Sequence, residues 1–158
     1  MNLAATSCYH GPAMARTAGI ILIGNELLSG KVADAKAVYL CRELRALGVD
    51  VRRIVVIPDE IEKIAHEVAE FSRTFDVVFT SGGVGPTHDD VTIEGVARAL
   101  DVRVSREPRL VEVLERYCKG QLNEARLKMA VIPQGAELAA GGALLFPAGV
   151  VSNSYLLP

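Results

Sequence analysis

The 158-residue sequence has the size of one ordinary domain, and its 50% apolar content is enough for a sizeable core. Its formal net charge is −2 and its basic residues are scattered, which argues against a nucleic-acid partner. The apolar runs are too short to span a membrane, and the N-terminus lacks the pattern of a secretory signal, so we expect a cytoplasmic protein.

Residues 1–16 have no hydrophobic periodicity, and we expect a disordered extension before a single domain over residues 17–158. Apolar runs and helical periodicity then predict alternating strands and helices. In chain order these are a strand at Ala18–Ile23, a helix at about 33–47, a strand at Val49–Ile57, a helix from Asp59 to about Arg73, a strand at Phe75–Thr80 and a helix at Val91–Leu100. Such alternation indicates an α/β fold with a mostly parallel central sheet.

The last third of the chain is less regular. Residues Glu107–Lys119 and Asn123–Met129 have helical patterns. Two short strands are predicted at Ala143–Phe146 and Val151–Leu157, joined by a hairpin around Pro147–Gly149.

Cysteine and histidine spacing indicates no metal cluster, because no cysteine pair has the C-x-x-C pattern and the three histidines are dispersed. Cys41 lies on the apolar face of a predicted helix with Leu44 and Leu47, where we expect a small core residue.

Polar and glycine-rich segments follow several predicted strands, at residues 24–36, 58–60, 81–90 and 152–154. Ligands of parallel α/β sheets bind at the carboxyl ends of the strands. We therefore expect these four segments to form one shared site.

The segment Ser81–Asp90 (SGGVGPTHDD) lies between a predicted strand and a predicted helix. Gly82, Gly83 and Gly85 would let backbone N–H groups approach an anion, and the helix N-terminus adds partial positive charge. The segment matches neither the P-loop nor the dinucleotide fingerprint. The interpretation as a phosphate-binding loop stands beside a plainer one, a tight turn followed by a helix cap.

Five carboxylates lie in these segments. Asp89 and Asp90 belong to the glycine loop, and Glu26, Asp34 and Asp59 follow other predicted strands. Carboxylates repel a phosphate unless a cation intervenes, and Mg²⁺ bridges carboxylate and phosphate oxygens, so we expect Mg²⁺ beside a small phosphorylated ligand. As an alternative, Asp34 and Asp59 could each only cap a helix, and Asp59 with Glu62 has the D-x-x-E spacing of a capping box.

Four segments of the sequence resemble the molybdopterin-binding-like domain. This domain occurs in molybdenum-cofactor biosynthesis proteins, in competence/damage-inducible protein A and beside eukaryotic FAD synthase. The segments are Gly24–Gly30, Ile57–Glu60, Ser81–Glu94 and Leu122–Pro133. The resemblance runs from about Ala18 to the end, and it implies a three-layer α/β sandwich that assembles as a homo-oligomer, either trimer or dimer.

The resemblance also implies roles for individual residues. The adenylyltransferase members hold a pterin phosphate in the glycine loop, and two aspartates that matter for transfer match Asp59 and Asp90 here. Both are therefore candidate catalytic residues, and Asp90 is the candidate metal ligand. The candidate ligand-binding residues are Gly24, Glu26, Asp34, Ser81, Gly82, Gly83, Gly85, Thr87 and Asp89.

Two departures from the family pattern bear on activity. Lys36 stands where an asparagine is usual, two residues after Asp34, which implies a different ligand or a loss of activity. The chain also ends at Pro158, where relatives continue with a Gly-x-Pro turn and a final helix, so a truncated C-terminus is one interpretation.

Three functions remain open at this point. The first is an Mg²⁺-dependent enzyme, either a pyrophosphatase acting on ADP-ribose- or FAD-like molecules or an adenylyltransferase-like enzyme. The second is a molybdopterin- or nucleotide-binding or regulatory module without turnover. The third is a structural oligomerisation domain, against which the intact glycine loop argues.

Overall fold

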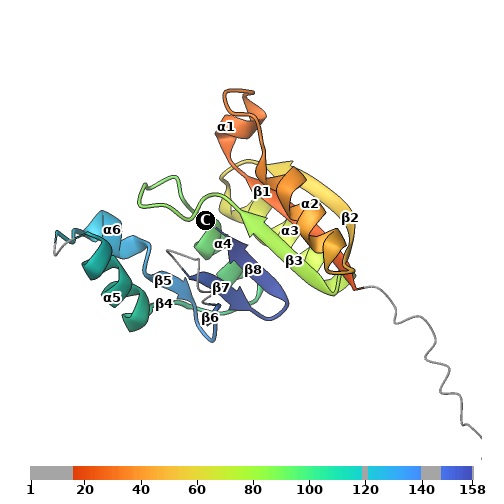
Figure 1. Ribbon diagram of the computed structural model, residues 1–158. Coiled ribbons are helices and arrows are strands. Elements are labelled where there is room, and N and C mark those ends of the chain that lie inside the picture. The colour runs from red at the N-terminus through yellow and green to blue at the C-terminus, as the bar shows by residue number, and fades with distance from the viewer. Residues whose placement is uncertain (1–15, 119–120, 140–146, 158) are drawn as a thin grey trace, which may run out of the picture.

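A computed structural model describes residues 16–118, 121–139 and 147–157 (Figure 1). Most of the predicted N-terminal extension and the whole of the predicted strand Ala143–Phe146 lie outside these residues. Among the described residues, no helix combines the length and the apolar character that crossing a bilayer would require.

A six-stranded sheet forms the centre of the molecule, in the strand order β2-β1-β3-β8-β7-β6. The strands are β1 (Thr17–Ile23), β2 (Asp50–Ile57), β3 (Val77–Ser81), β6 (Glu137–Ala139), β7 (Ala148–Val151) and β8 (Ser154–Leu157). Strands β2, β1, β3 and β8 pair in parallel, whereas β7 is antiparallel to both of its neighbours. The sheet is therefore mostly parallel, as predicted.

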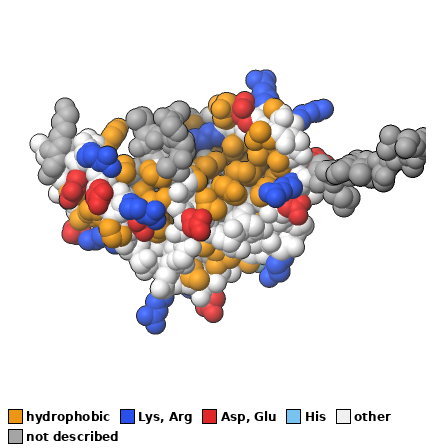
Figure 2. Space-filling model, turned by 60° about the horizontal axis from the view of Figure 1, so that its bottom comes forward, with side chains coloured by type: hydrophobic (Ala, Val, Ile, Leu, Met, Phe, Trp, Pro, Cys, Tyr) orange, Lys and Arg blue, Asp and Glu red, His pale blue; other side chains and the backbone are white. Residues whose placement is uncertain are grey.

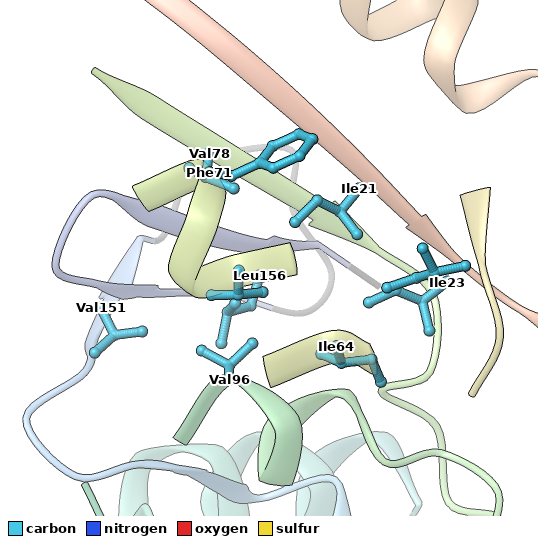
Figure 3. Packing of buried hydrophobic residues seen from close by; sticks show 10 residues of the cluster. Ile21, Ile23, Ile64, Phe71, Val78, Val96, Val151 and Leu156 are labelled. Carbon is cyan, nitrogen blue, oxygen red and sulfur yellow. The ribbon is translucent and has the colours of Figure 1, made fainter. Parts of the chain in front are cut away.

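Helices lie on both faces of this sheet (Figure 1). Helix α2 (Lys36–Ala46) packs on one face, where Ile20 and Leu22 of β1 join its buried side chains. Helices α3 (Ile61–Thr74) and α4 (Thr92–Ala99) cover the other face, where Ile21 and Ile23 point (Figure 3). Because successive side chains of a strand point to opposite faces, the uninterrupted apolar run of β1 serves both cores. The architecture is the expected three-layer sandwich.

The two faces of the sheet are covered to different degrees. On the side of α3 and α4, Val78 of β3 and Leu156 of β8 are fully or almost fully buried. On the side of α2, the rings of Phe79 and Tyr155 stack with centroids 5.2 Å apart and are only half-buried. Hydrophobic side chains also gather over a broad area of the surface shown in Figure 2.

A smaller unit lies beside the main sheet (Figure 1). Strands β4 (Val104–Arg106) and β5 (Val131–Pro133) pair antiparallel, and helices α5 (Pro108–Tyr117) and α6 (Glu124–Lys128) lie between them in the chain. Leu110, Leu114 and Ile132 form its core. Both helices agree with the predicted ones, whereas neither strand was predicted, because three residues are too few to show a period.

Cys41 packs half-buried against the cluster under α2, in agreement with its predicted core position. Leu47 does not, since it is 77% exposed: α2 ends at Ala46, and the chain leaves the sheet there.

The prediction for the C-terminal hairpin is wrong. Strands β7 and β8 are joined by a turn at Ser152 and Asn153, not at Pro147–Gly149. Gly149 belongs to β7 and is buried opposite Leu156, so this glycine marks close packing between strands rather than a turn.

Segment 152–154 lies at the opposite end of the sheet from the glycine loop, which corrects its predicted place in the site. Because β8 runs parallel to β3, Ser154 pairs with Val78 at the start of that strand. The Asn153 side chain instead donates hydrogen bonds to the carbonyl oxygens of Ser72 (3.1 Å) and Phe75 (2.9 Å), tying the turn to the end of α3.

We expect Asn153→Asp to lower the free energy of unfolding by about 2 kcal/mol or more, because two half-buried carbonyl groups lose their donor. The matched control is Asn123→Asp, since Asn123 caps α6 by accepting from the Arg126 N–H and aspartate caps equally well. Urea denaturation measures both variants, and equal stability of the two would contradict this role of Asn153.

Candidate functional site

The loops that follow β1, β2 and β3 meet at the carboxyl end of the sheet. The Gly24 N–H donates to the carbonyl of Ile57 (3.1 Å), and the Asn25 N–H donates to Asp59 Oδ2 (2.8 Å). The other carboxylate oxygen of Asp59 faces the third loop, 3.2 Å from the position that a Cβ on Gly83 would take. The structure therefore brings together Gly24, Asp59 and Gly83.

Asp59 does not cap α3, so the predicted capping box is wrong. The N-cap residue of α3 is Glu60, and no side chain accepts a hydrogen bond from the first turn. The carboxylate of Asp59 accepts from Asn25 instead, which places it between the ends of β1 and β3 rather than over its own helix.

Gly82 and Gly83 are required by the local backbone. Their φ angles are +103° and +64°, a region that L side chains rarely adopt. A Cβ on Gly82 would overlap the carbonyl oxygen of Ile23, and one on Gly83 would overlap the hydroxyl of Thr92. The loop can thus lie against β1 and α4 only because these two residues have no side chain.

Thr92 holds this loop in place and was not among the predicted site residues. Its fully buried hydroxyl donates to the carbonyl of Gly82 (2.8 Å), and its N–H donates to the carbonyl of Gly83 (3.0 Å). A polar residue two positions after Asp90, on the buried face at the start of a predicted helix, was the available signal.

Asp90 closes the second half of the loop. Its carboxylate accepts from the N–H of Thr87 (2.8 Å) and from the Thr87 hydroxyl, and a Cβ on Gly85 would lie 2.7 Å from Asp90 Oδ2. Helix α4 has Val91 as its N-cap, without a side-chain hydrogen bond, so Asp90 is not a helix cap.

The charge of Asp90 is stabilised by its surroundings. Burial acts to raise the pKa of this carboxyl group. Hydrogen bonds from Thr87 and Gly85 and the positive charge of Lys128 outweigh that effect, so the pKa lies below its ordinary value. Asp90 is therefore ionised at neutral pH.

Lys128 is a second residue that was not among the predicted site residues, although it lies in one of the family-like segments. Its ammonium group donates to the carbonyl oxygens of Thr87 (2.8 Å) and Asp90 (2.6 Å). No local pattern relates residues so far apart in the chain.

The remaining predicted residues have varied environments. Asp34 accepts from the N–H groups of Lys36 (3.1 Å) and Ala37 (2.9 Å) and so stabilises the start of α2. Glu26 follows β1 in the short helix α1 (Asn25–Leu28), where its carboxylate lies against Gly24. Asp89 is exposed and contacts His88 (2.8 Å).

Two cavities flank the glycine loop. A pocket of about 270 Å³ opens on the side of α2, and its polar lining includes Glu26, Asp34, Lys36 and Ser81. A smaller cavity of about 40 Å³ lies on the side of α4 and is lined by Gly85, Asp90, Glu94 and Lys128 among apolar side chains. The predicted ligand residues are thus divided between the two sides of the loop.

A separate cluster of possible metal ligands lies on α3, where His66, Glu67 and Glu70 come close together. Arg53 contacts both glutamates, at 2.5 Å from Glu70 and 3.7 Å from Glu67. The cluster therefore already holds a cationic side chain, and it lies outside the loops described above.

A family model described as a probable molybdopterin binding domain matches residues 19–151. The chain is 37% identical over 139 residues to a protein of Archaeoglobus fulgidus, covering 88% of this chain and 60% of that protein. It is 36% identical over 165 residues to a probable FAD synthase of Caenorhabditis elegans, covering 90% of this chain and 32% of that protein. The chain thus spans less than two thirds of the length of either relative.

Solved structures share the fold. The chain resembles the crystal structure of the protein CinA, of unknown function, from Thermoplasma acidophilum, with a TM-score of 0.82, 29% identity and coverage of 91% of this chain and 88% of that one. It also resembles the tungsten cofactor synthesizing protein MoaB from Pyrococcus furiosus, with a TM-score of 0.55, 19% identity and coverage of 92% and 83%.

We expect Gly82→Ala to destabilise the protein by about 3 kcal/mol or more, since its methyl group meets both an unfavourable φ and the Ile23 carbonyl. Gly30→Ala is the control, because Gly30 also has a positive φ (+69°) but open space around it. We expect it to cost about 1 kcal/mol. Chemical denaturation compares them, and similar losses would show that the contact with β1 is unimportant.

The lowered pKa of Asp90 predicts how stability depends on pH. The stabilisation from its charge is fully present above the ordinary aspartate value of 3.8 and is lost as pH falls through the lower folded-state pKa. The difference in unfolding free energy between the parent and Asp90→Asn should therefore be constant near neutral pH and shrink in acid. Urea titrations from about pH 7 to about pH 3 measure it, and a difference that does not change with pH is the contrary result.

Proposed function

This chain belongs to the probable molybdopterin binding domain family, and on that premise we propose that it binds a phosphorylated pterin or nucleotide at Ser81–Asp90 together with Mg²⁺. The observation that carries the proposal is the position of Asp59 beside Gly83. The carboxylate of Asp59, which follows β2, faces the glycine turn that follows β3. A cation bound by the carboxylate and a phosphate bound by the turn would therefore lie next to each other.

The backbone of the loop supports anion binding. Gly82 and Gly83 both have positive φ angles, so two consecutive peptide groups take part in the turn. A turn of this kind directs N–H groups toward an anion, and the absence of Cβ atoms permits close approach.

The residues present also suit Mg²⁺, which prefers carboxylate oxygens and retains water. Asp59 and Asp90 would hold it, and Asp90 is ionised because its pKa is lowered. When bound, the cation would neutralise phosphate charge and polarise a phosphoryl oxygen. Asp59, held through Oδ2 by Asn25, could orient an attacking water with Oδ1.

The proposed activity is hydrolysis of a pyrophosphate-linked nucleotide of the ADP-ribose or FAD type. An adenylyltransferase-like reaction would use the same residues and Mg²⁺, with a second substrate in place of water as the acceptor of the nucleotidyl group. The pocket of about 270 Å³ on the α2 side offers room for part of such a molecule.

A binding or regulatory module without turnover is the second candidate. Lys36 favours it, because this cation lines the larger pocket at a position where an asparagine is usual in the resembling family. A lysine there would attract an anionic ligand without supplying an acid, a base or a metal ligand.

A thermal-shift screen with Mg²⁺ against molybdopterin, ADP-ribose, FAD, NAD, CoA and ATP tests the proposal. Stabilisation by a phosphorylated compound supports binding, and Mg²⁺-dependent release of phosphate or nucleotide distinguishes enzyme from module. Absence of stabilisation by every compound would reject binding and favour a structural domain. Light scattering separately tests the expected dimer or trimer.

We expect Asp59→Asn and Asp90→Asn each to weaken Mg²⁺-dependent binding of the best compound by about tenfold or more, because each removes a charge from the cation site. Both asparagines retain a carbonyl oxygen for the native hydrogen bonds, so both variants should stay folded, and Asp90→Asn should lose only the stabilisation that the charge of Asp90 provides. Asp101→Asn is the control, because Asp101 is exposed and its φ of 54° suits asparagine.

Gly83→Val belongs to the same experiment. Its side chain would overlap the Thr92 hydroxyl, and we expect loss of binding. Parent affinity in a folded Gly83→Val variant, or in both asparagine variants, is incompatible with the assigned site. Isothermal titration calorimetry measures all four variants.

A further inference from the structure

Lys128 connects the smaller unit to the glycine loop. It is the last residue of α6, where a lysine ordinarily extends into solvent or contacts the final carbonyl groups of its own helix. Here the ammonium group donates to the carbonyl oxygens of Thr87 and Asp90, 41 and 38 residues away in the chain. These are charge-assisted hydrogen bonds, which are stronger than neutral ones.

The surroundings of Lys128 explain why these contacts hold the loop. Its side chain lines the small cavity of about 40 Å³ with Leu110 and Ile132 of the smaller unit and Asp90 and Glu94 of the main domain. The space is partly apolar and Lys128 is half-buried, so the two carbonyl oxygens replace part of the water that would otherwise solvate the ammonium group. The two carbonyl groups are therefore held to the smaller unit.

Lys128 contacts the same four-residue segment that the Asp90 carboxylate closes from the other end. Thr87 donates its N–H to that carboxylate, while its carbonyl accepts from Lys128. Asp90 is likewise held by its carboxylate and by its carbonyl. The conformation of the segment and the direction of the Asp90 carboxylate thus depend on one lysine from a distant helix.

We propose that Lys128 is a positioning residue, which holds Thr87–Asp90 in the conformation that binds a phosphate–Mg²⁺ group and reduces the repulsion between Asp90 and that phosphate. The proposal rests on the proposed function of this loop. It assigns the smaller unit a part in the site, because α6 presents the lysine and the core of Leu110, Leu114 and Ile132 supports the unit that carries it.

The test compares Lys128→Met, which keeps the length and apolar body of the side chain, with Lys128→Arg, which keeps the charge and the donors. Arg73→Met is the control, because Arg73 is an exposed cation at the C-terminal end of α3. Amide hydrogen exchange of residues 85–90 reports the loop without any ligand. Exchange of the amides of β1 and α3 reports global stability, and calorimetry with pyrophosphate and MgCl₂ reports binding.

We expect Lys128→Met to speed amide exchange at Thr87 and Asp90 about tenfold or more, as the loss of a charge-assisted hydrogen bond implies, and to weaken pyrophosphate binding by a similar factor. Lys128→Arg should restore part of each effect, and Arg73→Met should match the parent. Faster exchange confined to residues 85–90 separates positioning from general destabilisation, which would speed exchange throughout the protein.

Unchanged exchange of residues 85–90 in Lys128→Met would overturn the proposal, as would faster exchange with parent affinity for pyrophosphate. If the parent itself binds neither pyrophosphate with Mg²⁺ nor any compound of the thermal-shift screen, the proposed function fails. The exchange results then still decide whether Lys128 holds the loop.

Discussion

The candidate site depends on the close approach of β1 and β3 at the carboxyl end of the sheet. Parallel pairing from Ala18 with Val77 to Leu22 with Ser81 brings the two strands to this end side by side. Gly82 then passes against the Ile23 carbonyl, in a conformation and a space that exclude a side chain. The turn made possible there places Gly83 between Asp59, which follows β2, and Thr92 at the start of α4.

Negative charge at this end of the sheet is held by backbone donors. Asp59 accepts from Asn25, Asp34 from the first turn of α2 and Asp90 from Thr87. Each carboxylate thus stabilises a loop or a helix end near the carboxyl ends of the strands. Such an arrangement attracts cations rather than bare anions, which is why the proposed phosphate site includes Mg²⁺ and the positive charge of Lys128.

Much of the fold could be predicted from periodicity because its central elements are long and buried. Strands β1 to β3 and helices α2 to α4 all lie within the predicted segments or within a few residues of their ends. Short elements such as β4, β5 and α1 were missed, since three or four residues show no period. The hairpin turn was misplaced because a proline and a glycine close together, at Pro147 and Gly149, are a turn signal in the sequence. In the structure Gly149 pairs with Leu156 inside the hairpin, and the true turn has Ser152 at a φ of 54°.

The sequence by itself determined the alternation of strands and helices, and with it a parallel sheet whose strand ends carry Asp59 and the glycine loop. Only the tertiary structure decided which group each carboxylate contacts. Asp59 accepts from Asn25 instead of capping α3, Asn153 belongs to the opposite end of the sheet, and Lys128 reaches the loop from a separate unit. Periodicity reports which face of an element is buried. Hydrogen bonds between elements depend on strand direction and register, which exist only once the sheet is assembled.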